Sequence, residues 1–214
     1  MRKTKELGNT TIFFLRHGEP DNPQQIIKGT ADFILTEKGE KQILSQAQLL
    51  LRERMGALFT SPVLRCVQTA KIVAKILNED RTSLDKDGRP VGPGGLRIRR
   101  VNELIEWTSA VDGQPQAEAQ KMGRQEFIAA FEPHEKVISR MKVFVKKILT
   151  KYSGQTVIAV SHQGPIDLLL MDLAGEDYSQ TPFKGLTTQK GEMIKVKFNP
   201  KGEIVKLERI EAGA

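Results

Sequence analysis

Two histidines and two arginines are the residues of this sequence best suited to chemistry at phosphorus. They are Arg16, His17, Arg65 and His162, and each stands at or shortly after the end of a short apolar run. A neutral imidazole nitrogen is a good nucleophile and can carry a phosphoryl group covalently. Guanidinium groups bind phosphate oxygens in pairs and neutralise their charge. The four residues together therefore predict phosphoryl transfer.

A carboxyl group would complete this chemistry, because the leaving alkoxide needs a proton. Glu103 follows another apolar run and is the candidate for the proton donor. Glu106 lies three residues further on and could do the same work, but Glu103 is the preferred candidate.

The elements that must position these residues are short strands alternating with helices. Apolar and β-branched runs predict strands at 10–15, 57–60, 96–101 and 156–160, and a final hairpin at 193–198 and 204–207. Apolar spacing and capping residues predict helices at 36–54, 62–77, 115–131 and 166–173, and a long one that starts at Pro133.

This alternation predicts a three-layer α/β/α sandwich with a mostly parallel central sheet and a C-terminal edge hairpin. We expect one domain over residues 1–214, with a variable lid or insertion region at about 81–136. Ligands of open α/β sheets bind outside the carboxyl ends of the strands. The two histidines, the two arginines and the carboxylate are expected at that end.

The same residues carry a resemblance to a known family. The sequence resembles the histidine phosphatase superfamily, in its phosphoglycerate-mutase-like branch (branch 1), from residue 12 to about 173. The resemblance lies in Arg16-His17-Gly18-Glu19, in Ser61-Pro62 with Arg65 and Gln68-Thr69-Ala70, in Asn102-Glu103-Leu104 and in Val160-Ser161-His162. Four blocks in the same order are far more specific than Arg-His-Gly alone.

The resemblance implies a phosphohistidine enzyme that needs neither a metal nor a cofactor. His17 would be the nucleophile, and Arg16, Arg65 and His162 would form the phosphate pocket. Glu103 would act first as proton donor and then as base for water. By position, the residues expected near the substrate phosphate are Lys28, Gly29, Gln163 and Gly164.

Three departures from the family pattern affect substrate binding. The family often has Thr-x-Trp-Asn after Arg-His-Gly-Glu, whereas this chain has Pro-Asp-Asn-Pro at 20–23, so Asn22 is the candidate for the missing phosphate contact. Gln163 stands where the family usually has glycine. The stretch 107–136 lies where the family varies most and where its substrate lids are built.

Composition limits the class of protein. The 214 residues include 33 Lys and Arg against 26 Asp and Glu, and 39% are hydrophobic, as in ordinary globular proteins. With 6% aromatic residues and no long basic block, we expect no nucleic-acid partner and interpret the net charge of +7 as steering of anions. No run is long enough to span a membrane, so we expect a cytoplasmic protein without membrane contact.

Two remaining residues receive structural interpretations. The single cysteine, Cys66, is expected to be a small buried side chain, and it fits a reducing compartment. His134 is expected to have a surface or capping role.

The hairpin at the sheet edge could pair with a second copy of the chain, so a homodimer is possible.

The leading functional hypothesis is a phosphatase that hydrolyses a small phosphorylated metabolite through a phosphohistidine. The first alternative is a cofactor-dependent phosphoglycerate mutase, in which the same pocket would transfer rather than hydrolyse. The second alternative is a catalytically weak module that binds phosphate or a phosphoprotein, because a fold does not fix a function.

Overall fold

A six-stranded sheet forms the middle layer of the protein in a computed structural model, which describes residues 8–80, 95–119, 121–177 and 187–210. The strand order is β3-β2-β4-β1-β5-β6; the first four strands of this order are parallel, and β5 pairs antiparallel with β1 and with β6. The strands are β1 (Thr10–Arg16), β2 (Met55–Thr60), β3 (Ile98–Arg100), β4 (Thr156–Ser161), β5 (Met193–Phe198) and β6 (Ile204–Ile210).

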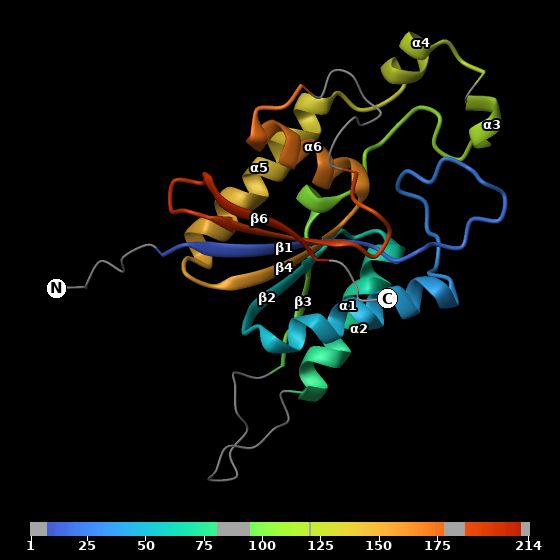
Figure 1. Cartoon of the computed structure of the whole chain (residues 1–214). Helices are drawn as coiled ribbons and strands as arrows, with labels where there is room; N and C mark the ends of the chain where they lie inside the picture. Colours follow the sequence, from blue (N-terminus) through green and yellow to red (C-terminus); the bar gives the residue numbers. More distant parts are fainter. Residues whose placement is uncertain (1–7, 81–94, 120, 178–186, 211–214) are drawn as a thin grey trace, which may run out of the picture.

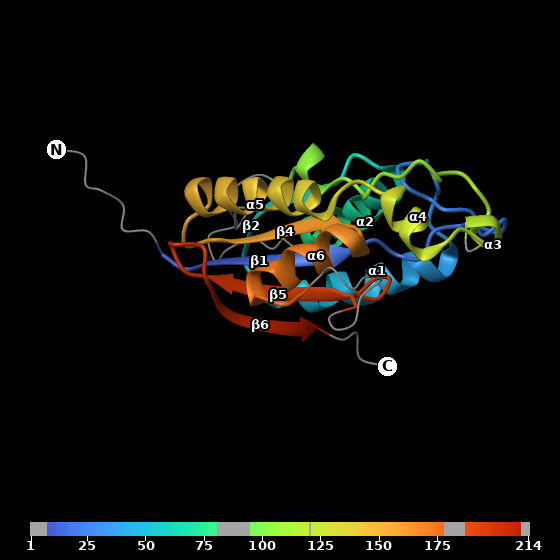
Figure 2. The same ribbon diagram turned by 90° about the horizontal axis from the view of Figure 1, so that it is seen from above.

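Helices cover both faces of this sheet, as Figures 1 and 2 show. One face carries α1 (Glu37–Leu49) and α2 (Leu64–Asp80), and the other carries α5 (His134–Lys151) and α6 (Gln163–Ala174). The shorter helices are η1 (Leu50–Arg52), η2 (Asn102–Leu104), α3 (Gln116–Ala119) and α4 (Arg124–Ala129). The predicted α/β/α sandwich with its C-terminal hairpin is confirmed.

The unbroken apolar sequence of the central strand β4 is explained by burial on both faces of the sheet. Val157 and Ala159 point into the core under α5 and α6, whereas Ile158 and Val160 point into the core under α1 and α2. All four are fully buried. Because successive side chains of a strand point to opposite faces, a strand covered on both faces needs apolar residues at every position.

The register of β1 against β4 positions the chemistry. Arg16 is paired with Ser161 at the carboxyl ends of these neighbouring parallel strands. His17 and His162 are the next residues of each chain segment, and His17 N–H donates to the Ser161 carbonyl at 3.1 Å. His162 is also the N-cap of α6. The two histidines are therefore neighbours because their strands are neighbours.

The loop after β1 is held against the start of α1. Thr36 caps α1, and its hydroxyl accepts a hydrogen bond from Gly39 N at 3.0 Å. A Cβ on Gly18 would lie 2.5 Å from the Gly39 carbonyl oxygen, so this crossing requires glycine.

Some predicted boundaries differ from the structure. The third strand is shorter than its predicted range of 96–101. The predicted helix at 115–131 is two short helices, α3 and α4, with Gly123 between them. Part of the predicted variable region, 81–94 and 120, lies outside the described residues. Within the described segments no helix has the length and apolarity needed to cross a bilayer.

Candidate active site

The carboxyl ends of the parallel strands bring both predicted histidines together. The rings of His17 and His162 lie edge to face, with their centroids 5.2 Å apart. Neither residue is more than 2% exposed. The structure therefore places two imidazoles from distant parts of the sequence side by side in one buried cluster.

Arg65 is the second residue of α2, and its side chain connects the two imidazoles. Its Nε–H donates to His17 Nε2 at 3.1 Å, and its Nη2 lies 3.1 Å from His162 Nδ1. The guanidinium also donates to the carbonyls of Gly29 at 2.7 Å and Ala31 at 3.1 Å. The whole side chain is buried. A buried positive charge is costly unless an anion compensates it, so this arrangement is suited to an anionic ligand.

The hydrogen bonds of His17 determine which of its nitrogens is free to react. Nδ1 lies 2.7 Å from the carbonyl of Gly18, which can only accept, so Nδ1 carries the proton. The lone pair is then on Nε2, where it receives the Arg65 N–H. The nitrogen with the free lone pair consequently faces the guanidinium and the second imidazole.

His162 has the opposite tautomer. Its Nδ1 accepts from Arg65, so the proton resides on Nε2, which lies 2.9 Å from Ser61 Oγ. Cys66 is fully buried against the same ring, as expected, and its burial raises the pKa of the thiol. Cys66 is therefore packing rather than a reactive thiol.

Both imidazoles are neutral in this environment. Burial lowers the pKa of His17 and that of His162 well below 6.5, and the positive charge of Arg65 lowers both further. An anion bound to the cluster would act in the opposite direction, because a negative charge favours the protonated ring.

The carboxylate in the cluster is Glu106 rather than Glu103. Glu106 Oε2 lies 3.4 Å from His162 Nδ1 and 3.5 Å from Arg65 Nη2. Its other oxygen accepts from the backbone N–H of Trp107 at 2.9 Å. Burial raises the pKa of Glu106, despite the opposing charge of Arg65. A raised pKa keeps a carboxyl group protonated at higher pH, as a proton donor requires.

The structure does not bring Glu103 into the cluster. Its carboxylate is ion-paired and hydrogen-bonded to Lys147 of α5, and this partner lowers its pKa. The two glutamates diverge because the 3-10 turn η2 ends at Leu104 and Ile105 is extended. An ionised, lysine-paired carboxylate is a poor proton donor, so the role expected for Glu103 fits Glu106 better.

Arg16 forms the far wall of the cluster at the end of β1. Its Nη1 donates to the Thr188 carbonyl at 2.6 Å, while its Nε is buried without a hydrogen-bond partner among the described residues. Thr188 is in turn held by the buried Asp167, which accepts from the threonine N–H at 3.1 Å and from its hydroxyl. Burial raises the pKa of Asp167 to about 6. Sequence reasoning missed this support, because Asp167 and Thr188 belong to no motif.

The residues expected near the phosphate lie in different parts of the structure. Lys28 and Gly29 belong to the cluster: the ammonium of Lys28 is close enough to lower the pKa of His17, and the carbonyl of Gly29 binds Arg65. Gly164 lies in the first turn of α6, where an added Cβ would meet Trp107 at 3.3 Å. Gln163 lies close enough to Asp167 for its side chain to lower the pKa of that carboxyl group.

Asn22 stands apart from this set. Its amide nitrogen donates to the Ile26 carbonyl at 2.9 Å, and its amide oxygen accepts from Ile26 N at 3.2 Å. Both ends of the side chain are used within its own loop, so Asn22 stabilises the loop.

Two segments cover the carboxyl ends of the strands, and sequence reasoning did not foresee that they bind each other. Ile27 N donates to the Gln114 carbonyl at 2.8 Å, and Gly113 N donates to the Ile27 carbonyl at 2.8 Å. A Cβ on Gly29 would overlap the Asp112 carboxylate. The loop at 20–30 and the segment at 109–116 therefore form one joint cover.

The described residues contain one group that could hold a metal ion. Ligand atoms of His17, Glu106 and His162 lie within 4.8 Å of one another. However, the Arg65 guanidinium contacts both imidazoles and faces the carboxylate. A cation there would be repelled by this guanidinium, so the group suits an anion better.

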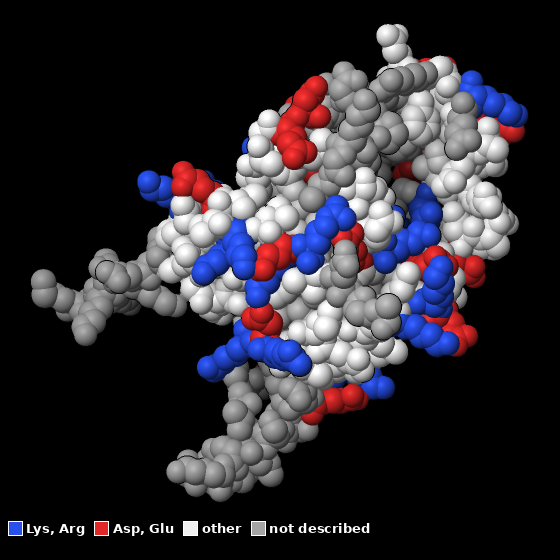
Figure 3. Space-filling view, in the orientation of Figure 1, with Lys and Arg blue, Asp and Glu red and all other residues white. Residues whose placement is uncertain are grey.

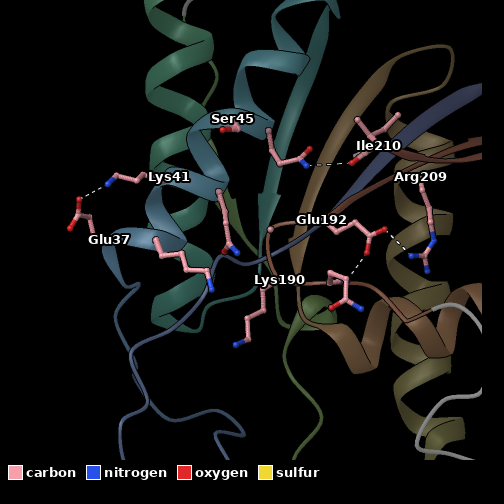
Figure 4. Close-up of a pocket in the computed structure, with 12 residues that line it drawn as sticks. Glu37, Lys41, Ser45, Lys190, Glu192, Arg209 and Ile210 are labelled. Carbon is pink, nitrogen blue, oxygen red and sulfur yellow. Dashed lines mark hydrogen bonds and ion pairs between the residues drawn. The ribbon is translucent and has the colours of Figure 1, made fainter. Parts of the chain in front are cut away.

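A separate cavity of about 890 Å³ lies between α1 and the ends of β5 and β6. Figure 4 shows ion pairs along it, including Lys41 with Glu37 at 2.6 Å and Arg209 with Glu192 at 3.0 Å. Over the face in Figure 3, Lys and Arg are interspersed with Asp and Glu. The positive balance is therefore not gathered into one patch on this face.

The neutral imidazoles should make stability depend on pH. The unfolded chain takes up protons near pH 6.5, whereas the folded rings do not, so folding is progressively opposed as pH falls below 6.5. For His17 alone, the loss between pH 7 and pH 5.5 should be about 1 kcal/mol. Urea unfolding of the wild type and of His17→Gln at the two pH values measures it as the change in their stability difference.

The partly exposed His134 supplies a control for that experiment. His134→Gln should change the pH dependence less than His17→Gln does. An equal stability difference between wild type and His17→Gln at both pH values would contradict the neutral, buried imidazole.

Comparisons with known proteins agree with this geometry. The family described as histidine phosphatase superfamily (branch 1) matches residues 12–210. The chain is 28% identical over 177 residues to "Phosphoserine phosphatase 1" of Hydrogenobacter thermophilus, covering 79% of this chain and 78% of that protein. It is 30% identical over 170 residues to "Probable phosphoglycerate mutase GpmB" of Cronobacter sakazakii, covering 77% and 74%.

Solved structures show the same fold. "Bacillus stearothermophilus YhfR" superposes with a TM-score of 0.74 at 21% identity, covering 91% of this chain and 94% of that one. The mycobacterial glucosyl-3-phosphoglycerate phosphatase Rv2419c, in complex with VO3, superposes with a TM-score of 0.75 at 19% identity, covering 95% and 99%. With the match over residues 12–210, the chain belongs to branch 1 of the histidine phosphatase superfamily.

Proposed function

We propose that this chain hydrolyses a small phosphomonoester through a phosphohistidine formed on Nε2 of His17, without a metal ion. The observation that carries the proposal is the position of that lone pair. It receives an N–H of the fully buried Arg65 guanidinium, and this guanidinium also faces the carboxyl group of Glu106, whose pKa is raised. The cluster therefore suits an anion. Named relatives of this chain include both a phosphatase and a mutase.

In the first step, the substrate phosphate takes over the hydrogen bonds of Arg65 and so releases His17 Nε2. This nitrogen attacks phosphorus, and the bond from phosphorus to the ester oxygen breaks. Glu106 gives its proton to the departing oxygen, which leaves as an alcohol. Arg16, Arg65 and His162 stabilise the charge on the phosphoryl oxygens.

In the second step, water attacks the phosphohistidine. The carboxylate of Glu106, now ionised, takes a proton from this water, and the bond from phosphorus to nitrogen breaks. Inorganic phosphate leaves, and His17 and Glu106 return to their starting states. The sum is ester plus water giving alcohol plus phosphate, so no further reactant is needed.

The mutase alternative is supported by the relative named as a phosphoglycerate mutase. A mutase would return the phosphoryl group to an acceptor instead of water. Incubation with phosphoglycerate and a bisphosphate primer distinguishes the two, because a mutase isomerises the substrate and releases no phosphate. We favour the hydrolase, with the binding module as the outcome if neither product forms.

The proposal includes the domain organisation, the cellular location and the self-association of the protein. We infer one domain over residues 1–214 with a variable region at about 81–136, acting on a small phosphorylated metabolite in the cytoplasm. The single, buried Cys66 suits a reducing compartment. The outer edge of β6 is where a second copy could add to the sheet.

Removing the nucleophile should abolish turnover. We expect hydrolysis of p-nitrophenyl phosphate to survive EDTA in the wild type and to fall at least about a thousandfold in His17→Ala. Acid-labile, base-stable phosphoenzyme should be trapped in the wild type only. Undiminished hydrolysis by His17→Ala would contradict the proposal, and His134→Ala serves as the control histidine.

The two glutamates offer a matched pair for the proton donor. Glu106→Gln should lower kcat/KM for an alkyl phosphate by about a hundredfold, within the usual range for a general acid. It should have little effect on p-nitrophenyl phosphate, whose leaving group needs no proton. Glu103→Gln should leave both substrates within about twofold of wild type. The reverse pattern would return the role to Glu103.

A further inference from the structure

The backbone that carries Glu106 lies beyond the last residue of β3, the edge strand of the described sheet, and past the end of its pairing with β2. Its carbonyls are instead bound by side chains. Arg140 Nη1 donates to the carbonyls of Glu103 at 2.8 Å and Ile105 at 2.7 Å. Arg140 Nη2 donates to the Glu106 carbonyl at 3.3 Å. One guanidinium therefore holds three carbonyls of a four-residue segment.

The fourth carbonyl has a separate donor. Ser161 Oγ–H, at the end of β4, donates to the Leu104 carbonyl at 2.8 Å. Leu104 itself is fully buried. Buried peptide groups must find hydrogen-bond partners, and here all four carbonyls at 103–106 find them in the side chains of β4 and α5.

Arg140 is itself fixed in place. It projects from α5, and its side chain is only 17% exposed. The Glu132 carboxylate lies 3.4 Å from Nη2 and orients the guanidinium from the other side. A planar fork with donors in fixed directions can serve three carbonyls at once, whereas the ammonium of a lysine is a compact point charge.

We propose that Arg140 is the positioning residue of the acid: by holding the backbone at 103–106 it sets the carboxyl group of Glu106 against His162 and Arg65. This inference rests on the proposed function and adds to it a residue that touches no reacting atom. The only backbone donor to the Glu106 carboxyl group in the described residues is Trp107 N–H, on the same segment. A shift of the segment therefore moves the acid away from the cluster, and displacements of about 1 Å are costly in catalysis.

The test is Arg140→Lys, which keeps the charge and loses the fork. We expect kcat/KM for an alkyl phosphate to fall at least about tenfold, because the acid is misplaced. For p-nitrophenyl phosphate we expect a change of less than about threefold. This ratio of kcat/KM values is the readout, because a general loss of folded protein would lower both substrates equally.

Three further variants complete the design. Glu132→Gln loosens the guanidinium without removing it. It should change the ratio of the two kcat/KM values in the same direction as Arg140→Lys, but by a smaller factor. Lys142→Met is the control on the same helix, because Lys142 pairs with Asp172 at 2.5 Å and not with the segment. Glu106→Gln combined with Arg140→Lys should be no slower on the alkyl phosphate than Glu106→Gln alone, because both act through one proton.

The outcomes distinguish a failure of the positioning role of Arg140 from a failure of the proposed phosphatase function. Equal losses on both substrates, or none, in Arg140→Lys would overturn the positioning role while Glu106→Gln still shows its selective loss. Full additivity in the double variant would also overturn it. Undiminished turnover by His17→Ala would instead contradict the proposed function itself.

Discussion

The site depends on one buried guanidinium. Arg65 is inaccessible to water, yet it donates to both imidazoles and to two backbone carbonyls of the loop after β1. Among the residues the structure describes, the one carboxyl group within about 4 Å of it is that of Glu106, whose Oε2 lies 3.5 Å from Nη2. A positive charge held this way is a preformed receptor for an anion, and it adds to the burial that keeps His17 and His162 neutral.

The sheet supplies the geometry that this charge requires. Burial on both faces makes β1 and β4 rigid neighbours, and their register places Arg16 opposite Ser161. The next residue on each strand is a histidine. Arg65 then needs only the first turn of α2 to lie between them. The histidines and arginines of the candidate site are therefore attached to the most buried part of the fold, whereas Glu106 comes from the loop after η2.

Sequence reasoning succeeded where one strand or one cap determined the answer. The apolar run before His162 could only be a doubly covered strand, so the position of that histidine followed. It favoured Glu103, whereas Glu106 lies in the cluster, because a short 3-10 turn and the extended Ile105 decide which side chain faces inward. Nor could it show that the amide of Asn22 binds Ile26 of its own loop. Such choices depend on tertiary hydrogen bonds that no local pattern encodes.

The central claim is that Arg65 holds two neutral imidazoles in opposite tautomers. With only three histidines in the chain, nitrogen-15 NMR of the labelled rings can assign each of them. At pH 7 and without ligand, the account predicts that His17 is protonated on Nδ1 and His162 on Nε2, and that both are neutral. An imidazolium at either position, or His17 protonated on Nε2, would contradict it.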